Sequence, residues 1–219
     1  MKKRIEALNK DYKKQSTSER LAQAHQDFER ILITSSFGTT SALLFEQFRL
    51  AGLKNYTVQF VNTGFLFDET LRYKDTLSAH YEFNVTEIKP ADWRFELTEK
   101  QQLWATNPDV CCAIKKIEPL EEVMKNYDLW ISGIMAWQND HRKNQEIFAV
   151  KHQLLKFHPL IDLQYSAAAQ FYLENPQLRH PLQSLGYESI GCTHCTSLGI
   201  GREGRWSGVS GKTECGLHL

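Results

Sequence analysis

Five cysteines are the residues in this chain most able to do chemistry. They fall at three places, namely Cys111–Cys112, Cys192 with Cys195, and Cys215. The two close pairs supply four thiolates, which is enough for one metal centre. Zinc sites usually separate both pairs by two or more residues, so adjacent cysteines favour a larger target such as an iron–sulfur cluster. Taken alone, Cys111–Cys112 could also be two buried apolar residues, and His194 inside CTHC is more often a spectator than a ligand.

Cys215 stands apart, four residues from the end of the chain. An ordinary thiol has a pKa near ~8.5, so only a minor fraction is thiolate at neutral pH, and nearby cations raise that fraction. Lys212 and His218 are close in the sequence, and the glycine-rich stretch before them carries Arg202 and Arg205. The pattern therefore allows a reactive nucleophile on a loose segment, although an inert thiol on a disordered tail would look the same.

A turn of small residues, SSFGTTS at 35–41, lies between an apolar run and a helical pattern. Ser36, Gly38, Thr39 and Ser41 would present hydroxyl and N–H groups at a helix N-terminus, which favours anions. A second such turn, at 62–64, holds Thr63 and Gly64. Many α/β loops look like this and bind no phosphate, but two of them at adjacent strand ends could flank one nucleotide.

The periodicity of the chain alternates between strand and helix. Ser16 and Glu19 form a capping-box pattern that predicts a helix to about Arg30, with Leu21, Ala24 and Phe28 buried. Strands are expected at 31–34, 84–90 and 128–134, a strand followed by its turn at 57–64, and helices at 41–53, 68–83, 91–104, 117–127 and 166–175. This alternation predicts an α/β fold with a mostly parallel sheet, helices on both faces and ligands at the carboxyl ends of the strands. The rhythm weakens after about Ala136, and 199–211 should be a mobile loop leading to a mobile C-terminal tail.

Composition sets further limits. The chain has 219 residues, 42% of them apolar, and 26 basic residues balance 26 acidic ones. A neutral balance gives no support for bulk binding to nucleic acid or to an anionic membrane, and no apolar run approaches the ~18 residues that span a bilayer. We expect a cytoplasmic protein of one domain, 1–219, with a helical extension at 1–30 and a loop and tail at 199–219. Thiols stay reduced in that compartment, so its cysteines are read as ligands or nucleophiles.

Together the motifs resemble one enzyme family. SSFGTTSALL, VNTGFLFDET, CCAIKKIEPL, LGYESIGCTHC and GREGRW…GKTECGLHL are similar to segments of the adenylyl-sulfate and phosphoadenylyl-sulfate reductases, over roughly residues 30 to 219. ECGLH is the most specific match. The resemblance implies an adenine-nucleotide hydrolase-like fold and a role in assimilatory sulfur metabolism.

The resemblance also implies site roles. Members with both cysteine pairs carry a 4Fe–4S cluster, here on Cys111, Cys112, Cys192 and Cys195, and mainly reduce adenylyl sulfate. Cys215 would attack the sulfur of the sulfate group, release AMP and carry an S-sulfo group outward to thioredoxin. Contacts to the substrate are expected from Ser36, Gly38, Ser41, Thr63, Gly64, Lys116, Arg202, Arg205 and His218. A homo-oligomer is compatible with the sequence.

Three positions depart from the family pattern. Met135 stands where an arginine is expected to help bind the substrate anion, and His141, Arg142 or Lys143 could supply that charge instead. Lys115 replaces the usual arginine beside Lys116, which keeps the charge but not the bidentate geometry. The first turn reads TTS where an acidic or amide residue is common. These departures weaken the choice of substrate and leave the reaction class intact.

Other functions remain open at this point. A phosphoadenylyl-sulfate reductase, or an enzyme accepting both nucleotides, would need extra cations for the 3′-phosphate. A non-catalytic zinc-binding protein would explain the cysteine pairs but leave ECGLH without a role. An enzyme of the ATP-pyrophosphatase type would share the fold and would not need Cys215.

Overall fold

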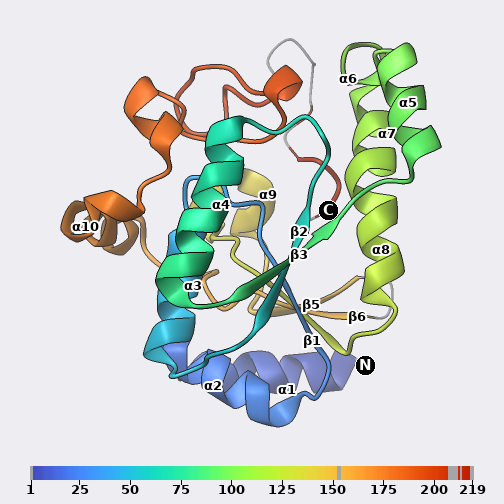
Figure 1. Ribbon diagram of the computed structural model, residues 1–219. Coiled ribbons are helices and arrows are strands. Elements are labelled where there is room, and N and C mark those ends of the chain that lie inside the picture. The colour runs from blue at the N-terminus through green and yellow to red at the C-terminus, as the bar shows by residue number, and fades with distance from the viewer. Residues whose placement is uncertain (1, 152–153, 207–211, 213, 218–219) are drawn as a thin grey trace.

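A single six-stranded sheet forms the centre of the protein (Figure 1). The computed structural model describes residues 2–151, 154–206, 212 and 214–217. The strands lie in the order β3-β2-β1-β4-β6-β5, and all pairings are parallel except that of β5 with β6. Their bounds are β1 Ile31–Thr34, β2 Thr57–Val61, β3 Asn84–Ile88, β4 Leu129–Ser132, β5 Phe148–Lys151 and β6 Leu154–Phe157.

Helices cover both faces of this sheet, as the sequence predicts. Figure 1 shows α3 and α4 on one side, α5 to α8 on the other, and α1 and α2 below. No helix within the described ranges is long and apolar enough to cross a bilayer. The helix bounds are α1 Lys2–Tyr12, α2 Thr17–Asp27, α3 Ser41–Leu50, α4 Asp68–Tyr81, α5 Asp92–Lys100, α6 Leu103–Thr106, α7 Pro108–Cys112, α8 Glu118–Met124, α9 Asp140–Lys143 and α10 Tyr165–Glu174.

The capping box predicted before α2 is present. The Ser16 N–H donates to Glu19 Oε2 at 2.7 Å, and the Glu19 N–H donates back to Ser16 Oγ at 3.4 Å. These bonds satisfy donors that the first turn of a helix leaves free. Leu21, Ala24 and Phe28 are buried, as expected, although the helix ends at Asp27 rather than Arg30.

Several elements differ from the sequence expectation. The helix expected at 91–104 is two helices, because Gln102 adopts a left-handed conformation (φ 47°) between α5 and α6. A π-helical turn, Ala113–Ile117, joins α7 to α8, so the helical segment begins earlier than predicted. Strands β5 and β6 were not predicted, and in β6 the apolar pattern is interrupted by Lys156. Its side chain is nonetheless buried, with its ammonium 4.9 Å from the ring centroid of Trp130.

An aromatic cluster holds the loop between β1 and α3 in place. Phe37 is fully buried, and its ring lies 5.7 Å from that of Phe45 and 5.3 Å from that of Phe60. Phe83 stacks on the same group, 4.4 Å from Phe45. Phe37 has a positive φ of 48°, which is unusual for a bulky side chain and needs support from its surroundings. The packing therefore fixes the turn that faces the cavity described below.

Arg20 ties the N-terminal helices to the rest of the protein. Its guanidinium donates to both carboxylate oxygens of Asp162 at 2.6 and 2.7 Å, and to the carbonyls of Tyr12 and Pro159. Replacement Arg20→Met should lower the free energy of unfolding by about 2 kcal/mol, because buried carbonyls lose their donors. Urea denaturation at neutral pH measures this.

Arg30→Met is the matched control, because Arg30 forms a solvent-exposed pair with Asp128 and its loss should change the stability much less than the loss of Arg20. Hydrogen bonding to Arg20 holds the pKa of Asp162 below its ordinary value. The contribution of this pair is therefore present at neutral pH and is lost as the pH falls through that lowered pKa. Equal losses in the two variants, or a difference from wild type that does not shrink in acid, would contradict this role.

Candidate functional site

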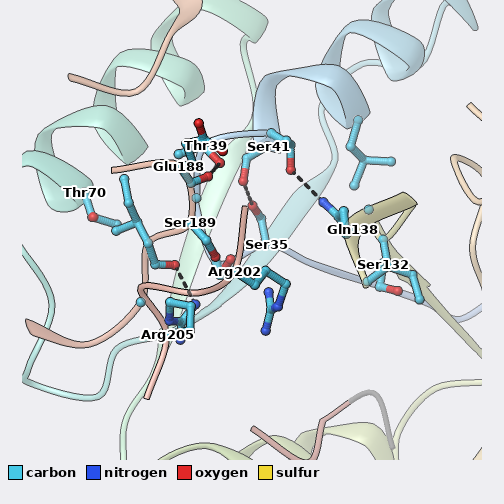
Figure 2. Close-up of a pocket in the computed structure, with 18 of the residues that line it drawn as sticks. Ser35, Thr39, Ser41, Thr70, Ser132, Gln138, Glu188, Ser189, Arg202 and Arg205 are labelled. Atoms are coloured by element: carbon cyan, nitrogen blue, oxygen red, sulfur yellow. Dashed lines mark hydrogen bonds between the residues drawn. The ribbon is translucent and has the colours of Figure 1, made fainter. Parts of the chain in front are cut away.

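A cavity of about 930 Å³ opens at the carboxyl ends of β1, β2 and β4. This is the edge of a parallel sheet where ligands bind. Figure 2 shows Arg202 and Arg205 reaching into it below Ser35 and Ser41, with Gln138 and Ser132 at one side. The lining that matters most for chemistry comprises Ser36, Gly38, Ser41, Thr63, Lys116, Ser132, Gln138, Arg142, Arg202, Arg205, Glu214 and Cys215.

The first turn forms the anion-facing wall. Ser36, Gly38 and Ser41 all line the cavity, and α3 begins at Ser41. The turn is held by the Phe37 N–H, which donates to Ser35 Oγ at 3.0 Å, and by the Thr39 hydroxyl, which donates to the carbonyl of Glu188 at 2.9 Å. The N-terminus of α3, a ten-residue helix, therefore lies at the cavity wall, where the helix dipole places partial positive charge.

The second turn connects the cavity to the cysteines. Thr63 lines the cavity, and its hydroxyl lies 3.2 Å from Cys192 Sγ. Gly64 is not among the lining residues. It has a positive φ of 75°, and its N–H donates to Asn62 Oδ1 at 3.0 Å, so its place in the structure is the turn itself.

Both cysteine pairs meet beside the cavity. Cys111, Cys112 and Cys192 are buried, and Cys195 is half-buried. Burial, and then the charges of the other three thiols, raise the pKa of Cys111 to about 12. Burial would also raise the pKa of Cys192, but Lys116, Thr63 and Arg205 outweigh it and hold that pKa below the ordinary value. Among the residues that the structure describes, no three His, Cys, Asp or Glu side chains converge closely enough to hold one metal ion.

His194 packs against two aromatic rings. Its ring stacks on Trp104 at 4.2 Å with the planes only 10° apart, and it meets Phe65 edge-on at 4.9 Å. The expected role as spectator stays a prediction, and this packing is consistent with it.

Lys116 lies where the cysteines and the cavity meet. Burial would lower its pKa, but the charges of Cys192, Cys215 and Cys112 outweigh that cost and raise it. Lys116 follows Cys112 by four residues, and Lys115 follows Cys111 by four, so the wide π-helical turn carries each lysine near one cysteine. Lys116 thus remains charged beside three thiols.

Arg202 and Arg205 come from a segment expected to be loose. The described part of it folds back instead, with the Ser197 N–H donating to the Gly204 carbonyl at 2.8 Å and the Trp206 N–H to the Cys195 carbonyl at 3.0 Å. Residues 207–211 lie outside the described residues. Arg205 donates to the Ile190 carbonyl at 3.1 Å, while burial, followed by the charge of Arg142, lowers the pKa of Arg202 to about 10.

Of the three residues that could supply the charge missing at Met135, Arg142 is on the cavity lining, and its contact with the substrate stays a prediction. Met135 is fully buried in the core, whereas Arg142 lines the cavity. Asn139 caps α9 by accepting the Arg142 N–H at 2.8 Å, and the guanidinium contacts Gln138. A cap residue three positions earlier is the only local sequence signal for this placement.

Glu214 was not anticipated from the sequence. Its carboxylate accepts hydrogen bonds from Arg142 Nε at 2.6 Å, Asn139 Nδ2 at 2.9 Å and Arg202 Nη2 at 3.3 Å. Burial would raise its pKa, but the two arginines and the hydrogen bonds hold it below the ordinary value. Cys215, the next residue, lines the cavity. His218 lies outside the described residues, so its expected contact stays a prediction.

Comparison with known proteins shows which family the chain resembles. Residues 30–198 match the phosphoadenosine phosphosulfate reductase domain. A protein of Bacillus cytotoxicus named adenosine 5′-phosphosulfate reductase is 36% identical over 170 residues, which is 74% of this chain and 72% of the relative. A Bacillus cereus protein of the same name is 33% identical over 211 residues, 90% of this chain and 88% of the relative.

The chain belongs to this family. Its resemblance to the adenylyl-sulfate and phosphoadenylyl-sulfate reductases is thereby confirmed.

Solved structures confirm the fold class. A phosphoadenylyl-sulfate reductase from Candida auris superposes with a TM-score of 0.75 at 23% identity, over 90% of this chain and 98% of that one. An FMN adenylyltransferase from Candida glabrata superposes with a TM-score of 0.56 at 13% identity, over 86% of this chain and 64% of that one. The second likeness is to a protein solved with an ATP analogue, which fits the adenine-nucleotide type of fold.

A substitution at Gly191 can test whether the position of Arg205 matters for binding. A Cβ added at Gly191 would clash with the Arg205 guanidinium, 2.5 Å from its Cζ, so Gly191→Ala should push that cation from the cavity. We expect the Kd for AMP to rise about tenfold, because a charged hydrogen bond is lost. Isothermal titration calorimetry measures it. The double variant Gly191→Ala/Arg205→Met should bind no more weakly than Arg205→Met, and additive losses would show that Gly191 acts elsewhere.

Proposed function

We propose that this protein reduces adenylyl sulfate to sulfite and AMP in assimilatory sulfate reduction, with Cys215 as nucleophile and thioredoxin as reductant. The observation that supports this best is the position of Cys215, which lines the same cavity as the N-terminus of α3 and the cations Lys116, Arg142, Arg202 and Arg205. The relatives named adenosine 5′-phosphosulfate reductase support the substrate.

The proposed chemistry has two steps. The Cys215 thiolate attacks the sulfur of the sulfate group, an S–S bond forms, and the S–O bond to AMP breaks with its electron pair leaving on the phosphate. A thiolate of thioredoxin then attacks Cys215 Sγ and expels sulfite, which takes the S–S electron pair. The second thioredoxin thiol closes a disulfide and frees Cys215, so the reductant is oxidised as the sulfur is reduced.

Charge is the main obstacle to the first step. Two unit charges ~4 Å apart repel by about 4 kcal/mol at an effective dielectric near 20. Lys116 lies beside Cys215, and Arg205 lies close enough to influence the same group of charges. Cations that are already in position before the reaction offset this repulsion, and the site spends no free energy on reorienting them during the step.

The four paired cysteines suit a 4Fe–4S cluster. Their thiols lie close enough to influence one another's pKa, and four cysteine thiolates are the ligand set that such a cluster takes. When bound, the cluster would supply a fixed anionic neighbour that keeps Lys116 charged and oriented. Cys111, Cys112, Cys192 and Cys195 would hold it, and Cys215 would remain free to react.

We propose adenylyl sulfate rather than its 3′-phosphorylated form as the substrate, because the 3′-phosphate would need a further cation. Arg179 is the further cation on the cavity lining, and its Nε donates to the Tyr172 carbonyl at 3.0 Å, so the guanidinium is partly engaged. Steady-state rates with the two nucleotides decide between them, and a strong preference for the phosphorylated form would favour the alternative.

We further propose one domain over 1–219, with the N-terminal helices and the tail as appendages, in a cytoplasmic enzyme.

The nucleophile can be tested directly. Cys215→Ser should lower sulfite production by at least about 1000-fold, because the first bond cannot form, while AMP binding should remain. Wild-type enzyme mixed with adenylyl sulfate and no reductant should gain about 80 Da on the C-terminal peptide by mass spectrometry, one SO₃ group. Full turnover by Cys215→Ser would instead support the ATP-pyrophosphatase type of activity.

The metal centre has an independent readout. Protein purified without air should be brown, absorb near about 400 nm and hold about four irons per chain, whereas a zinc protein is colourless. Cys192→Ser should lose the colour, while Cys215→Ser and His194→Ala should keep it. Colour lost in Cys215→Ser would show that this thiol is a ligand, and stoichiometric zinc in place of iron would establish the zinc alternative.

A further inference from the structure

The segment around Cys215 lacks a helix or strand of its own within the described residues 212 and 214–217. Its position must therefore come from side-chain contacts to the rest of the protein. The proposed chemistry needs Cys215 in two places, against the nucleotide and then against the reductant. What fixes the first position is accordingly a question about the residues on either side of Cys215.

Glu214 anchors the segment before Cys215. Its side chain is only 1% exposed, and a buried carboxylate is costly unless it is paired. Donors reach it from two separate parts of the chain, Asn139 with Arg142 around α9 and Arg202 on the loop before the tail. Three donors on one carboxylate leave the backbone at this residue little room to move.

Lys151 anchors the segment after Cys215. Its ammonium at the end of β5 donates to the Gly216 carbonyl at 2.6 Å and to the Leu217 carbonyl at 3.3 Å. Leu217 packs against the apolar group that includes Leu120 and Trp130. Gly216 has a φ of 91°, and a Cβ there would lie 2.6 Å from Ile117 Cδ1, so the chain turns tightly against the π-helical turn just after Cys215.

From these contacts we propose that Glu214 and Lys151 are positioning residues that form a clamp on the two sides of Cys215 and hold its thiol against the cavity. This inference rests on the proposed function. The clamp favours attack on the nucleotide, which needs the closed position, and opposes departure of the tail toward the reductant. Loss of either anchor should therefore act in opposite directions on the two steps.

The variants are Glu214→Gln, which keeps the shape of the side chain but removes its charge, and Lys151→Met, which removes the donor to both carbonyls. Their matched controls are Glu203→Gln and Lys54→Met, because Glu203 and Lys54 are exposed. Far-ultraviolet circular dichroism and the urea midpoint establish that each variant is folded.

Alkylation of Cys215 by iodoacetamide, a neutral reagent, measures how long the thiol spends outside the clamp. The modified C-terminal peptide is quantified by mass spectrometry. Both variants should react about tenfold faster than wild type, and the controls at the wild-type rate. The two substitutions change the local charge in opposite directions. Faster reaction in Glu214→Gln with slower reaction in Lys151→Met would therefore indicate an effect on thiol ionisation and overturn the clamp.

The two half-reactions give the second readout. With adenylyl sulfate and no reductant, formation of the Cys215 adduct should be about tenfold slower in both variants, with the Kd for AMP within about twofold of wild type. Release of sulfite from the preformed adduct by thioredoxin should be unchanged or faster. Equal slowing of both steps, or AMP binding weakened as much as adduct formation, would overturn the clamp in favour of a substrate-binding role.

Failure of the proposed function is separable from failure of the clamp. If wild-type protein forms no adduct, the assigned chemistry is wrong, yet the alkylation rates still report on the clamp. If wild type forms the adduct and both variants match it in adduct formation and alkylation, the chemistry stands and the clamp is refuted.

Discussion

The site depends on bringing positive charge together in a partly buried space. Lys116, Arg142, Arg202 and Arg205 reach one cavity from three parts of the chain. Buried cations are costly unless each has a partner. Lys116 lies among three thiols, Arg142 and Arg202 share Glu214, and Arg205 donates to the Ile190 carbonyl. The protein therefore balances the cavity with its own anions and dipoles, and a bound nucleotide enters a field that is already arranged.

The neighbouring residues Lys115 and Lys116 lie in different surroundings. Lys116 faces the cavity, whereas Lys115 is 1% exposed and places its ammonium 3.9 Å from the ring centroid of Phe65 and 3.2 Å from that of Phe95. Burial lowers the pKa of Lys115 to about 8. Aromatic faces attract a compact cation without needing the fork of a guanidinium. The two aromatic rings around the Lys115 ammonium therefore explain why a lysine can replace the arginine expected at this position.

Much of the fold could be predicted because local patterns agree with it. Apolar runs between helical periods marked β1 to β4, and small residues after β1 and β2 marked the two turns that face the cavity or border it. Periodicity missed β5 and β6, and in β6 a charged residue, Lys156, is buried against the Trp130 ring, which a polar–apolar pattern does not anticipate. It also failed at Gln102, whose left-handed conformation nothing in the local sequence requires.

Within the site, the residues that could be named from the sequence were those with distinctive chemistry at distinctive spacing. Arg142 and Glu214 were harder, because the ion pair between them joins positions 72 residues apart in the chain. A lone glutamate before a cysteine and an arginine in a short polar helix carry no local signal of an ion pair.

The ion pair between Arg142 and Glu214 also links the position of the tail to the charge balance of the cavity. Glu214 supplies negative charge to Arg142 and Arg202, so a tail that leaves the cavity uncovers two guanidinium groups in a poorly solvated space. The phosphate of a nucleotide in the cavity would meet the same two guanidinium groups while the carboxylate is in place. Thermodynamic linkage then requires that occupancy of the cavity and docking of the tail influence each other to the same extent. In this arrangement the segment that carries Cys215 is held by the same cations that a bound nucleotide would contact, so its position depends on what the cavity contains.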